Sequence, residues 1–349
     1  MSYFMFFVAK MFEMCYNAVM KKLYYATFEK GLDEIVKKII TKQDKNAFIK
    51  KLYPDAILFF ADERFKLSCS CFKTAYSVYD YNQKDGVGAL NAEMKHLLEK
   101  KDLFVRFSRD VKSFKLLILK EDSKVAVDAK LKQAVETMLA RKTKKQVSYL
   151  NGTEELVILS KADGINLFMR KINIDFEFSK IRSLQIEPEL SYVLSFMSEP
   201  AQSEAVVDPF SYDGAVCYVR ALSFKKANVI ANEKETQNVD DIKKLAKSLK
   251  EKSFSVMNYD FLSDNFPIKF IDKIVTVLPS MNYDFEMSLS KLYEEFFAKC
   301  FKLGVKIVAV AVHKSMDITN AIKGKFGIET KVGTQKYNLF KLKIKNTTK

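Results

Sequence analysis

The chain has 349 residues, of which 48% are hydrophobic and 29% are charged. This composition is typical of a folded protein and excludes a mainly disordered chain, and the length predicts about two domains. The 58 lysines and arginines exceed the 43 acidic residues, so the net charge is +15. Such a surplus favours a phosphate-bearing partner, although a lysine-biased composition alone would produce the same charge.

The first part of the chain predicts a mixture of strands and helices. Strands are expected at 23–28, 56–60, 66–72, 75–80, 104–107, 116–119, 155–160 and 166–170, with the last two forming a hairpin around Gly164. Helices are expected at 29–40, 91–101 and 127–142, where apolar residues recur at helical spacing. We therefore expect an α+β region here.

From residue 188 onward, strands alternate with helices. Strands are expected at 205–208, 227–233, 254–259, 273–278, 305–312 and 337–344, and helices at 215–222, 240–250, 288–303 and 318–323. Apolar strands that alternate with helices predict a buried parallel sheet with helices on both faces. This part is therefore predicted to be a doubly wound α/β domain. The terminal lysines of its last predicted strand are expected to form a solvated face, namely Lys341, Lys343, Lys345 and Lys349.

Cysteine and histidine usage argues against a metal site. The chain has two histidines, His96 and His313, and five cysteines, and their spacings do not match those of zinc ligands. The close pair Cys69 and Cys71 lies in a predicted strand, so we expect both thiols in the core. An odd cysteine count favours a reducing, cytoplasmic compartment. No apolar run reaches the roughly 18 residues of a membrane helix, so we expect no membrane partner.

Polar or acidic residues follow the first four strands of the predicted α/β domain. Asp208 begins a turn that ends at Gly214 before a helix, Glu233 ends the second strand, and Asp260 follows the third. Ligands of doubly wound sheets bind at this carboxyl edge, where an acid after the second strand hydrogen-bonds a ribose. The edge is therefore the predicted ligand site. The alternative role for Glu233 is a solvated helix-capping acid, and a purely structural role is likewise the alternative for Asp260.

These residues resemble the class I methyltransferase fold, in particular the THUMP-containing RNA methyltransferases. The run Asp208-Pro-Phe-Ser-Tyr-Asp-Gly-Ala215 is in register with the family's Asp-Pro-Phe-Cys-Gly-Ser-Gly-Thr motif, and 184–190 with 194–200 resembles its lead-in helix. The segment 24–35 is similar to the family's opening segment, and the THUMP region is expected at about 65–159. The resemblance implies an extension at 1–19, a THUMP-like RNA-binding region at 20–180 and a class I methyltransferase-like domain at 181–349.

The resemblance also implies a cofactor, S-adenosylmethionine, and a substrate base in tRNA or ribosomal RNA, by family analogy at the exocyclic amine of guanine. The turn from Asp208 to Gly214 would line the methionine part, Glu233 would hold the ribose hydroxyls, and Asp260 with Phe261 would flank the adenine. The residues that the resemblance assigns to the cofactor are Asp208, Phe210, Gly214, Glu233, Asp260 and Phe261.

Two positions depart from the family pattern. Tyr212 stands where the family has the first glycine of its turn, and its side chain would occupy space that a close ligand approach requires. After the fourth strand the family has Asn/Asp-Pro-Pro-Tyr/Phe, whereas this chain has Val277-Leu-Pro-Ser280. Pro279 is retained, and Asn282 with Tyr283 would have to supply the missing amide and ring.

Pro279 and Asn282 are therefore the candidate catalytic residues. The alternative is a catalytically inactive RNA-binding protein with a degenerate methyltransferase domain. An oxidoreductase on the same fold is disfavoured because the sequence has no Gly-x-Gly-x-x-Gly turn.

Basic residues form two groups in the region that resembles an RNA-binding module. One group surrounds a predicted strand and the other follows a predicted helix: Arg106, Arg109, Lys112 and Lys115, then Lys142, Lys144 and Lys145. A mixed α+β module without a recognition helix favours structured RNA over duplex DNA. We therefore expect these residues to contact tRNA or ribosomal RNA.

Overall fold

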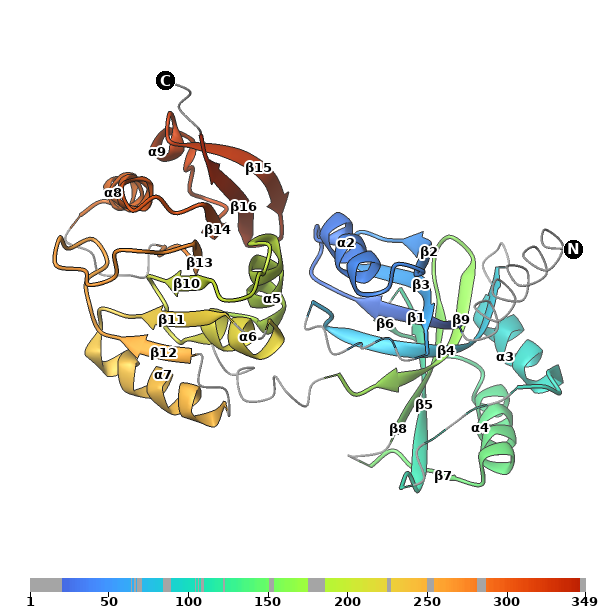
Figure 1. Cartoon of the computed structure of the whole chain (residues 1–349). Coiled ribbons are helices and arrows are strands. Elements are labelled where there is room, and N and C mark those ends of the chain that lie inside the picture. Colours follow the sequence, from blue (N-terminus) through green and yellow to red (C-terminus); the bar gives the residue numbers. More distant parts are fainter. Residues whose placement is uncertain are drawn as a thin grey trace, which may run out of the picture.

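The computed structural model of the chain contains two sheets, one in each half (Figure 1). The structure describes residues 21–345 except 64, 66, 68–70, 84–88, 104, 106, 108–109, 122, 151–153, 175–185, 225–226, 250–253 and 281–286. Several sequence predictions lie outside the described residues, namely those for residues 1–19, Cys69, Arg106, Arg109, Asn282, Tyr283 and Lys349.

The first sheet has nine strands in the order β2-β3-β1-β4-β9-β8-β5-β6, with β7 paired to β5. Its strands are β1 (Lys21–Thr27), β2 (Phe48–Leu52), β3 (Ala56–Asp62), β4 (Thr74–Gln83), β5 (Ser113–Lys120), β6 (Ser123–Lys124), β7 (Gln146–Val147), β8 (Glu154–Ser160) and β9 (Ile165–Ile172). Its helices are α2 (Asp33–Gln43), α3 (Ala89–Glu99) and α4 (Ala129–Thr143). The pairs are antiparallel except those of β5 with β7 and β8, so the predicted α+β class is confirmed.

The second sheet has seven strands in the order β12-β11-β10-β13-β14-β16-β15. Its strands are β10 (Ala205–Asp208), β11 (Asn228–Asn232), β12 (Phe254–Met257), β13 (Lys273–Val277), β14 (Ile307–His313), β15 (Phe326–Gly333) and β16 (Tyr337–Ile344). Its helices are α5 (Pro188–Met197), α6 (Ala215–Ser223), α7 (Thr236–Ser248), α8 (Leu289–Lys302) and α9 (Thr319–Ile322). The neighbouring strands β12, β11, β10, β13 and β14 all run parallel to one another.

Helices cover both faces of the second sheet, as the strand–helix alternation predicts. Val206 belongs to an apolar cluster with residues of α5 and α6, whereas the next residue, Val207, belongs to a cluster with α8. Successive side chains of a strand point to opposite faces, so β10 is buried between two helical layers. The fold is therefore doubly wound.

The prediction of a wholly parallel sheet is wrong at one edge. Strand β16 runs antiparallel to β14 and to the edge strand β15, which the sequence analysis missed. Lys341 of β16 is only 8% exposed, and its ammonium group pairs with Glu199 and Glu329. The expectation of a solvated face is therefore wrong for Lys341.

Two strands expected in the first half are not found among the described residues. Leu67 and Cys71 lie in turns, and Val105 and Phe107 lie outside any strand. These apolar side chains are packed from loops: Phe107 stacks on Phe114 with ring centroids 5.9 Å apart. Cys71 is fully buried, which confirms the predicted core position for this thiol. Among the described helices, none combines the length and the hydropathy that crossing a membrane requires.

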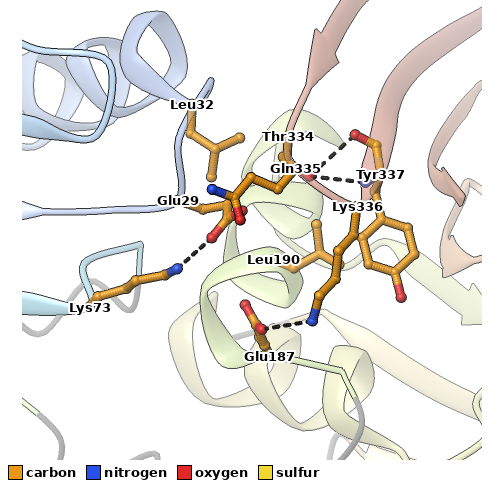
Figure 2. Close-up of a pocket in the computed structure, with 9 residues that line it drawn as sticks. All are labelled: Glu29, Leu32, Lys73, Glu187, Leu190, Thr334, Gln335, Lys336 and Tyr337. Atoms are coloured by element: carbon orange, nitrogen blue, oxygen red, sulfur yellow. Dashed lines mark hydrogen bonds and ion pairs between the residues drawn. The ribbon is translucent and has the colours of Figure 1, made fainter. Parts of the chain in front are cut away.

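The two halves of the chain pack together through α2 and α5, which face each other in Figure 1. The Gln43 amide donates a hydrogen bond to the Tyr192 hydroxyl at 3.3 Å. Figure 2 shows where the β1–α2 loop, α5 and the β15–β16 turn meet around a cavity of about 150 Å3. Gly31 has φ of +95°, and a Cβ there would lie 2.0 Å from the Gly333 carbonyl oxygen. This junction therefore requires a glycine.

Candidate functional site

The carboxyl ends of the parallel strands β10, β11, β12 and β13 meet at one edge of the second sheet (Figure 1). The chain continues from β10 to β11 on one side, while β13 and β14 lie on the other side, so the switch point is between β10 and β13. Asp208 ends β10, and Glu233 directly follows β11. The structure therefore places the predicted acidic residues along the predicted edge.

The turn after β10 is held by hydrogen bonds within its own residues. The Ser211 hydroxyl donates to the Asp208 carbonyl oxygen at 2.9 Å, and the Gly214 N–H donates to the Ser211 carbonyl oxygen at 2.7 Å. Gly214 has φ of +78°, and a Cβ there would lie 3.0 Å from Ile242 of α7. A glycine is required here for both conformation and packing, and α6 begins at the next residue.

Tyr212 adopts a glycine-like conformation in this turn. Its φ is +48°, in the left-handed region, at the position where the resemblance places a glycine. Its N–H donates to Glu233 Oε2 at 2.7 Å, and the Glu235 N–H donates to Oε1 at 2.9 Å. Glu233 is 3% exposed, so it is a buried acid that holds the turn and not a solvated cap.

Asn232 is a residue of this edge that sequence reasoning missed. It ends β11 and is fully buried. Its Nδ2 donates to the carbonyl oxygens of Pro209 at 3.2 Å and Tyr259 at 3.0 Å, and its Oδ1 accepts from the Tyr259 N–H at 3.2 Å. One side chain thus joins the loops after β10 and β12. The only sequence signal was an amide at the end of an apolar strand.

The residues after β12 point to different environments. The Asp260 carboxylate is exposed and lies 3.5 Å from the Lys234 ammonium group. The Phe261 ring is 2% exposed, and its centroid lies 6.2 Å from that of Phe210 and 5.8 Å from that of Phe296. The Phe261 ring is therefore a core side chain in this structure, while Phe210 is half-buried beside it.

The segment after β13 carries the candidate catalytic residues. Pro279 is buried, and its carbonyl oxygen accepts a hydrogen bond from the Tyr293 hydroxyl at 2.6 Å. Val277 ends β13 and is half-buried, as is Ser280. Within the described part of this segment, 277–280, no side chain carries an amide or a carboxylate.

The edge concentrates carboxyl groups. The pKa of Asp208 is raised from 3.8 to about 7, chiefly by burial and to a lesser extent by the nearby Asp213 and Glu233, while hydrogen bonds from Thr276 and the Phe210 N–H act in the opposite direction. Burial also raises the pKa of Glu233. Asp213 and Glu233 disfavour the ionised form of Asp208, and a positive charge placed near these carboxyl groups would favour it.

The predicted RNA-contacting lysines divide into two groups. Lys115 pairs with Glu155 at 2.8 Å, and the Lys142 ammonium group donates to the carbonyl oxygens of residues 100 and 101. Lys112 and Lys144 are exposed and Lys145 is half-buried. The Gln146 N–H donates to the Lys112 carbonyl oxygen at 3.2 Å, which brings the main chain at Lys112 next to that of Gln146, the residue that follows Lys144 and Lys145. We call these three residues the lysine cluster.

Comparison with known proteins identifies the fold. No protein-family model and no curated protein sequence matches this chain. The crystal structure of TrmN from Thermus thermophilus aligns with a TM-score of 0.74 at 13% identity, over 93% of this chain and 99% of that chain. The fold is that of a methyltransferase. SMU.472, described as a methyltransferase and complexed with SAH, aligns with a TM-score of 0.69 at 11% identity, over 94% and 99% of the two chains.

A third structure extends the same result. A protein from Listeria monocytogenes str. 4b F2365, described as an N6-adenine-specific DNA methylase, aligns with a TM-score of 0.65 at 12% identity, over 94% of this chain and 97% of that chain. These alignments span both halves of the chain. They confirm the predicted Rossmann-like methyltransferase fold and show that the first half has a structural counterpart in the same proteins.

Proposed function

We propose that this chain binds S-adenosylmethionine at the carboxyl edge of the second sheet and RNA with its first half, and transfers a methyl group to an RNA base. The observation that carries the proposal is the Asp208–Gly214 turn bonded to Glu233 at the switch point of a methyltransferase fold. The resemblance in sequence points to tRNA or ribosomal RNA, and to the exocyclic amine of guanine.

The residues present fit this cofactor in charge. S-Adenosylmethionine carries a positive sulfonium and an ammonium group, and Asp208, Asp213 and Glu233 place carboxyl groups at this edge. In the proposal the turn lines the methionine part, Glu233 accepts from the ribose hydroxyls and Asp260 binds the adenine amino group. The bound cofactor supplies the activated methyl group. Asn232 holds the loops that carry these residues.

The RNA part of the proposal is supported by charge and by the fold. The net charge is +15, and the lysine cluster is displayed on the first half, away from the cofactor edge. The Listeria neighbour is described as a predicted N6-adenine-specific DNA methylase, which is consistent with a nucleic acid substrate on this fold. Phosphate contacts would position the RNA, while the base would be presented to the edge near Pro279.

A second candidate function is a catalytically inactive RNA-binding protein. The observation that favours it is the segment after β13, where Val277 and Ser280 replace the family's amide or acid and its aromatic ring. Such a protein would retain the RNA contacts of the first half and lose the transfer step.

The test is transfer of a radiolabelled methyl group from S-adenosylmethionine to tRNA and to ribosomal RNA, with duplex DNA alongside. The proposal predicts labelled RNA, and Glu233→Gln lowers the rate at least about tenfold because a charged partner of the cofactor is lost. Glu235→Gln, which changes an exposed neighbour, leaves the rate unchanged. RNA binding without label in RNA supports the second candidate, and absence of both binding and label contradicts both.

A further inference from the structure

Helices α3 and α4 lie side by side in the first half (Figure 1) and share one apolar cluster. A groove of about 670 Å3 runs along α4. Leu98 lines it from α3, and the rest of its lining comes from α4, namely Lys130, Gln133, Ala134, Thr137, Met138, Arg141 and Lys142. These α4 residues recur every three or four positions, so they form one continuous stripe along the helix. The buried positions of α4, Val135 and Leu139, lie on a different stripe.

The middle of the groove is lined by small and apolar side chains. Leu98 and Met138 are half-buried, and Ala134 is exposed. The Thr137 hydroxyl donates to the Gln133 carbonyl oxygen at 2.8 Å, so its hydrogen bond is made within α4. Small side chains at a contact allow two helices to approach closely. The middle of the groove is therefore suited to the apolar face of another helix.

The two ends of the groove carry positive charges that have no acidic partner. Lys130 lies in the first turn of α4 and Arg141 in the last, and both are exposed. Within the described part of the chain, neither charged group forms an ion pair or a hydrogen bond. At a rise of about 1.5 Å per residue they lie roughly 17 Å apart along the helix. No acidic side chain is among the described residues that line the groove.

We propose that this groove binds an acidic amphipathic helix of a partner protein. The apolar face of that helix packs on Leu98, Ala134 and Met138, and a carboxylate at each end pairs with Lys130 and with Arg141. Helices bind grooves of this kind through apolar residues three and four positions apart, and opposite charges at the ends fix the register. This interaction does not depend on the proposed methyl transfer.

Other occupants fit the groove less well. Two copies of the chain that met at this stripe would place cation against cation, whether the two α4 helices ran parallel or antiparallel, and like charges repel. An RNA backbone would need charged groups or donors for successive phosphates, whereas no lining residue between Lys130 and Arg141 is charged. An acidic helix satisfies both the apolar middle and the basic ends.

The test uses a fluorescein-labelled synthetic helical peptide that is long enough to span the groove. It carries leucine and alanine on one face and a glutamate at each end of that face, and its binding to the full chain is measured by fluorescence anisotropy. We expect saturable binding, and we expect the double variant Lys130→Glu, Arg141→Glu to weaken it at least about tenfold, because both end contacts become repulsive. A second peptide with lysine in place of the two glutamates should bind this double variant better than it binds the unaltered protein.

Two further variants control for net charge and for the apolar middle. Lys95→Glu with Lys124→Glu makes the same change in net charge at exposed lysines of the same half that do not line the groove, so binding of the acidic peptide should be unchanged. Ala134→Gln keeps a good helix former and fills the middle with a polar side chain, so binding should weaken while the charges at the ends remain.

Several results would overturn the proposal. The proposal is wrong if the acidic peptide does not bind, or if the two double variants weaken its binding equally. If neither peptide binds and Lys130→Glu, Arg141→Glu weakens the binding of tRNA, the groove belongs to an RNA surface. If the same variant dissociates a dimer detected by sedimentation, the occupant is a second copy of the chain.

Discussion

At the scale of single residues, the buried carboxyl group of Asp208 lowers the stability of the folded protein at neutral pH. Its pKa is raised by burial from 3.8 to about 7, so the folded protein keeps a proton that the unfolded chain has already released. The folded state therefore binds more protons between these two values, and stability falls as the pH rises through this range.

This argument predicts the effect of Asp208→Asn on stability. The amide keeps an oxygen that accepts from the Phe210 N–H and removes the buried charge, so we expect the free energy of unfolding to rise by about 1 to 4 kcal/mol at about pH 8. The gain should be smaller at about pH 5. Thermal unfolding at both pH values measures it, with the exposed Asp260→Asn as control. A Tm of Asp208→Asn below that of the unaltered protein at about pH 8 would contradict the account.

Tyr212 leads to a second residue-scale prediction. Its side chain stands in a turn position with φ of +48°, a conformation that costs a bulky residue about 1 to 2 kcal/mol. Tyr212→Gly keeps the N–H that donates to Glu233 and removes the ring, so we expect tighter binding of S-adenosylmethionine.

Tyr212→Ala provides the control because it removes the ring and keeps the Cβ. If both variants tighten binding equally, the ring is the obstruction. If neither variant changes the calorimetric Kd, Tyr212 does not obstruct the site, and the argument that a ligand needs the space left by the family's glycine is wrong.

At the scale of elements, the contact between the β1–α2 loop and the β15–β16 turn predicts a strong effect at one glycine. A Cβ at Gly31 would meet the Gly333 carbonyl oxygen at 2.0 Å, so Gly31→Ala must displace one half of the chain from the other. We expect it to lower the free energy of unfolding by at least about 2 kcal/mol, measured by urea unfolding.

Gly324→Ala is the matched control for backbone strain alone. Gly324 has φ of +76°, and its Cβ would meet nothing within 4 Å. Equal losses in the two variants would show that the interface contact adds nothing. A larger loss for Gly31→Ala, accompanied by a greater radius of gyration in solution scattering, is the expected result.

Most elements of the second half follow from the sequence because their strands are buried on both faces. The run from Ile307 to Val312 is apolar throughout, so its strand was predictable. Strand β15 was not, because only Phe326 is buried in it and its other positions are half-buried or exposed. Strand β2 was missed for the same reason. The strand expected at 66–72 is the opposite case. Leu67 and Cys71 lie in turns, and apolar residues that pack into the core from loops produce the same sequence pattern as a strand.

The positions of the site residues were partly predictable. Asp208 and Glu233 follow strands, and the rule that ligands bind at the carboxyl edge locates them from the sequence alone. Which side chains face outward after a strand depends on loop geometry, so the burial of Phe261 and the exposure of Tyr259 required the structure. The hydrogen bonds of Asn232 join segments that are distant in sequence, so no local sequence pattern predicts them.

At the scale of the whole molecule, the account requires the first half to bind RNA through charge. Replacing Lys112, Lys144 and Lys145 with alanine should weaken RNA binding. It should also reduce the magnitude of the slope of log K for RNA binding against log salt concentration by about 2 to 3, because fewer counterions are released when fewer phosphates are contacted. The matched control replaces three exposed lysines of α7, Lys243, Lys244 and Lys247. An equal loss in the control would indicate a general charge effect and remove the lysine cluster as a binding site.

The central claim is that the edge formed by Asp208, Tyr212 and Glu233 binds S-adenosylmethionine. A calorimetric titration of the full chain, with Glu233→Gln and Glu235→Gln in parallel, tests it most directly. The account predicts micromolar binding that Glu233→Gln weakens by about tenfold or more and Glu235→Gln leaves intact. Absence of heat at millimolar ligand, or equal binding by Glu233→Gln, would contradict it.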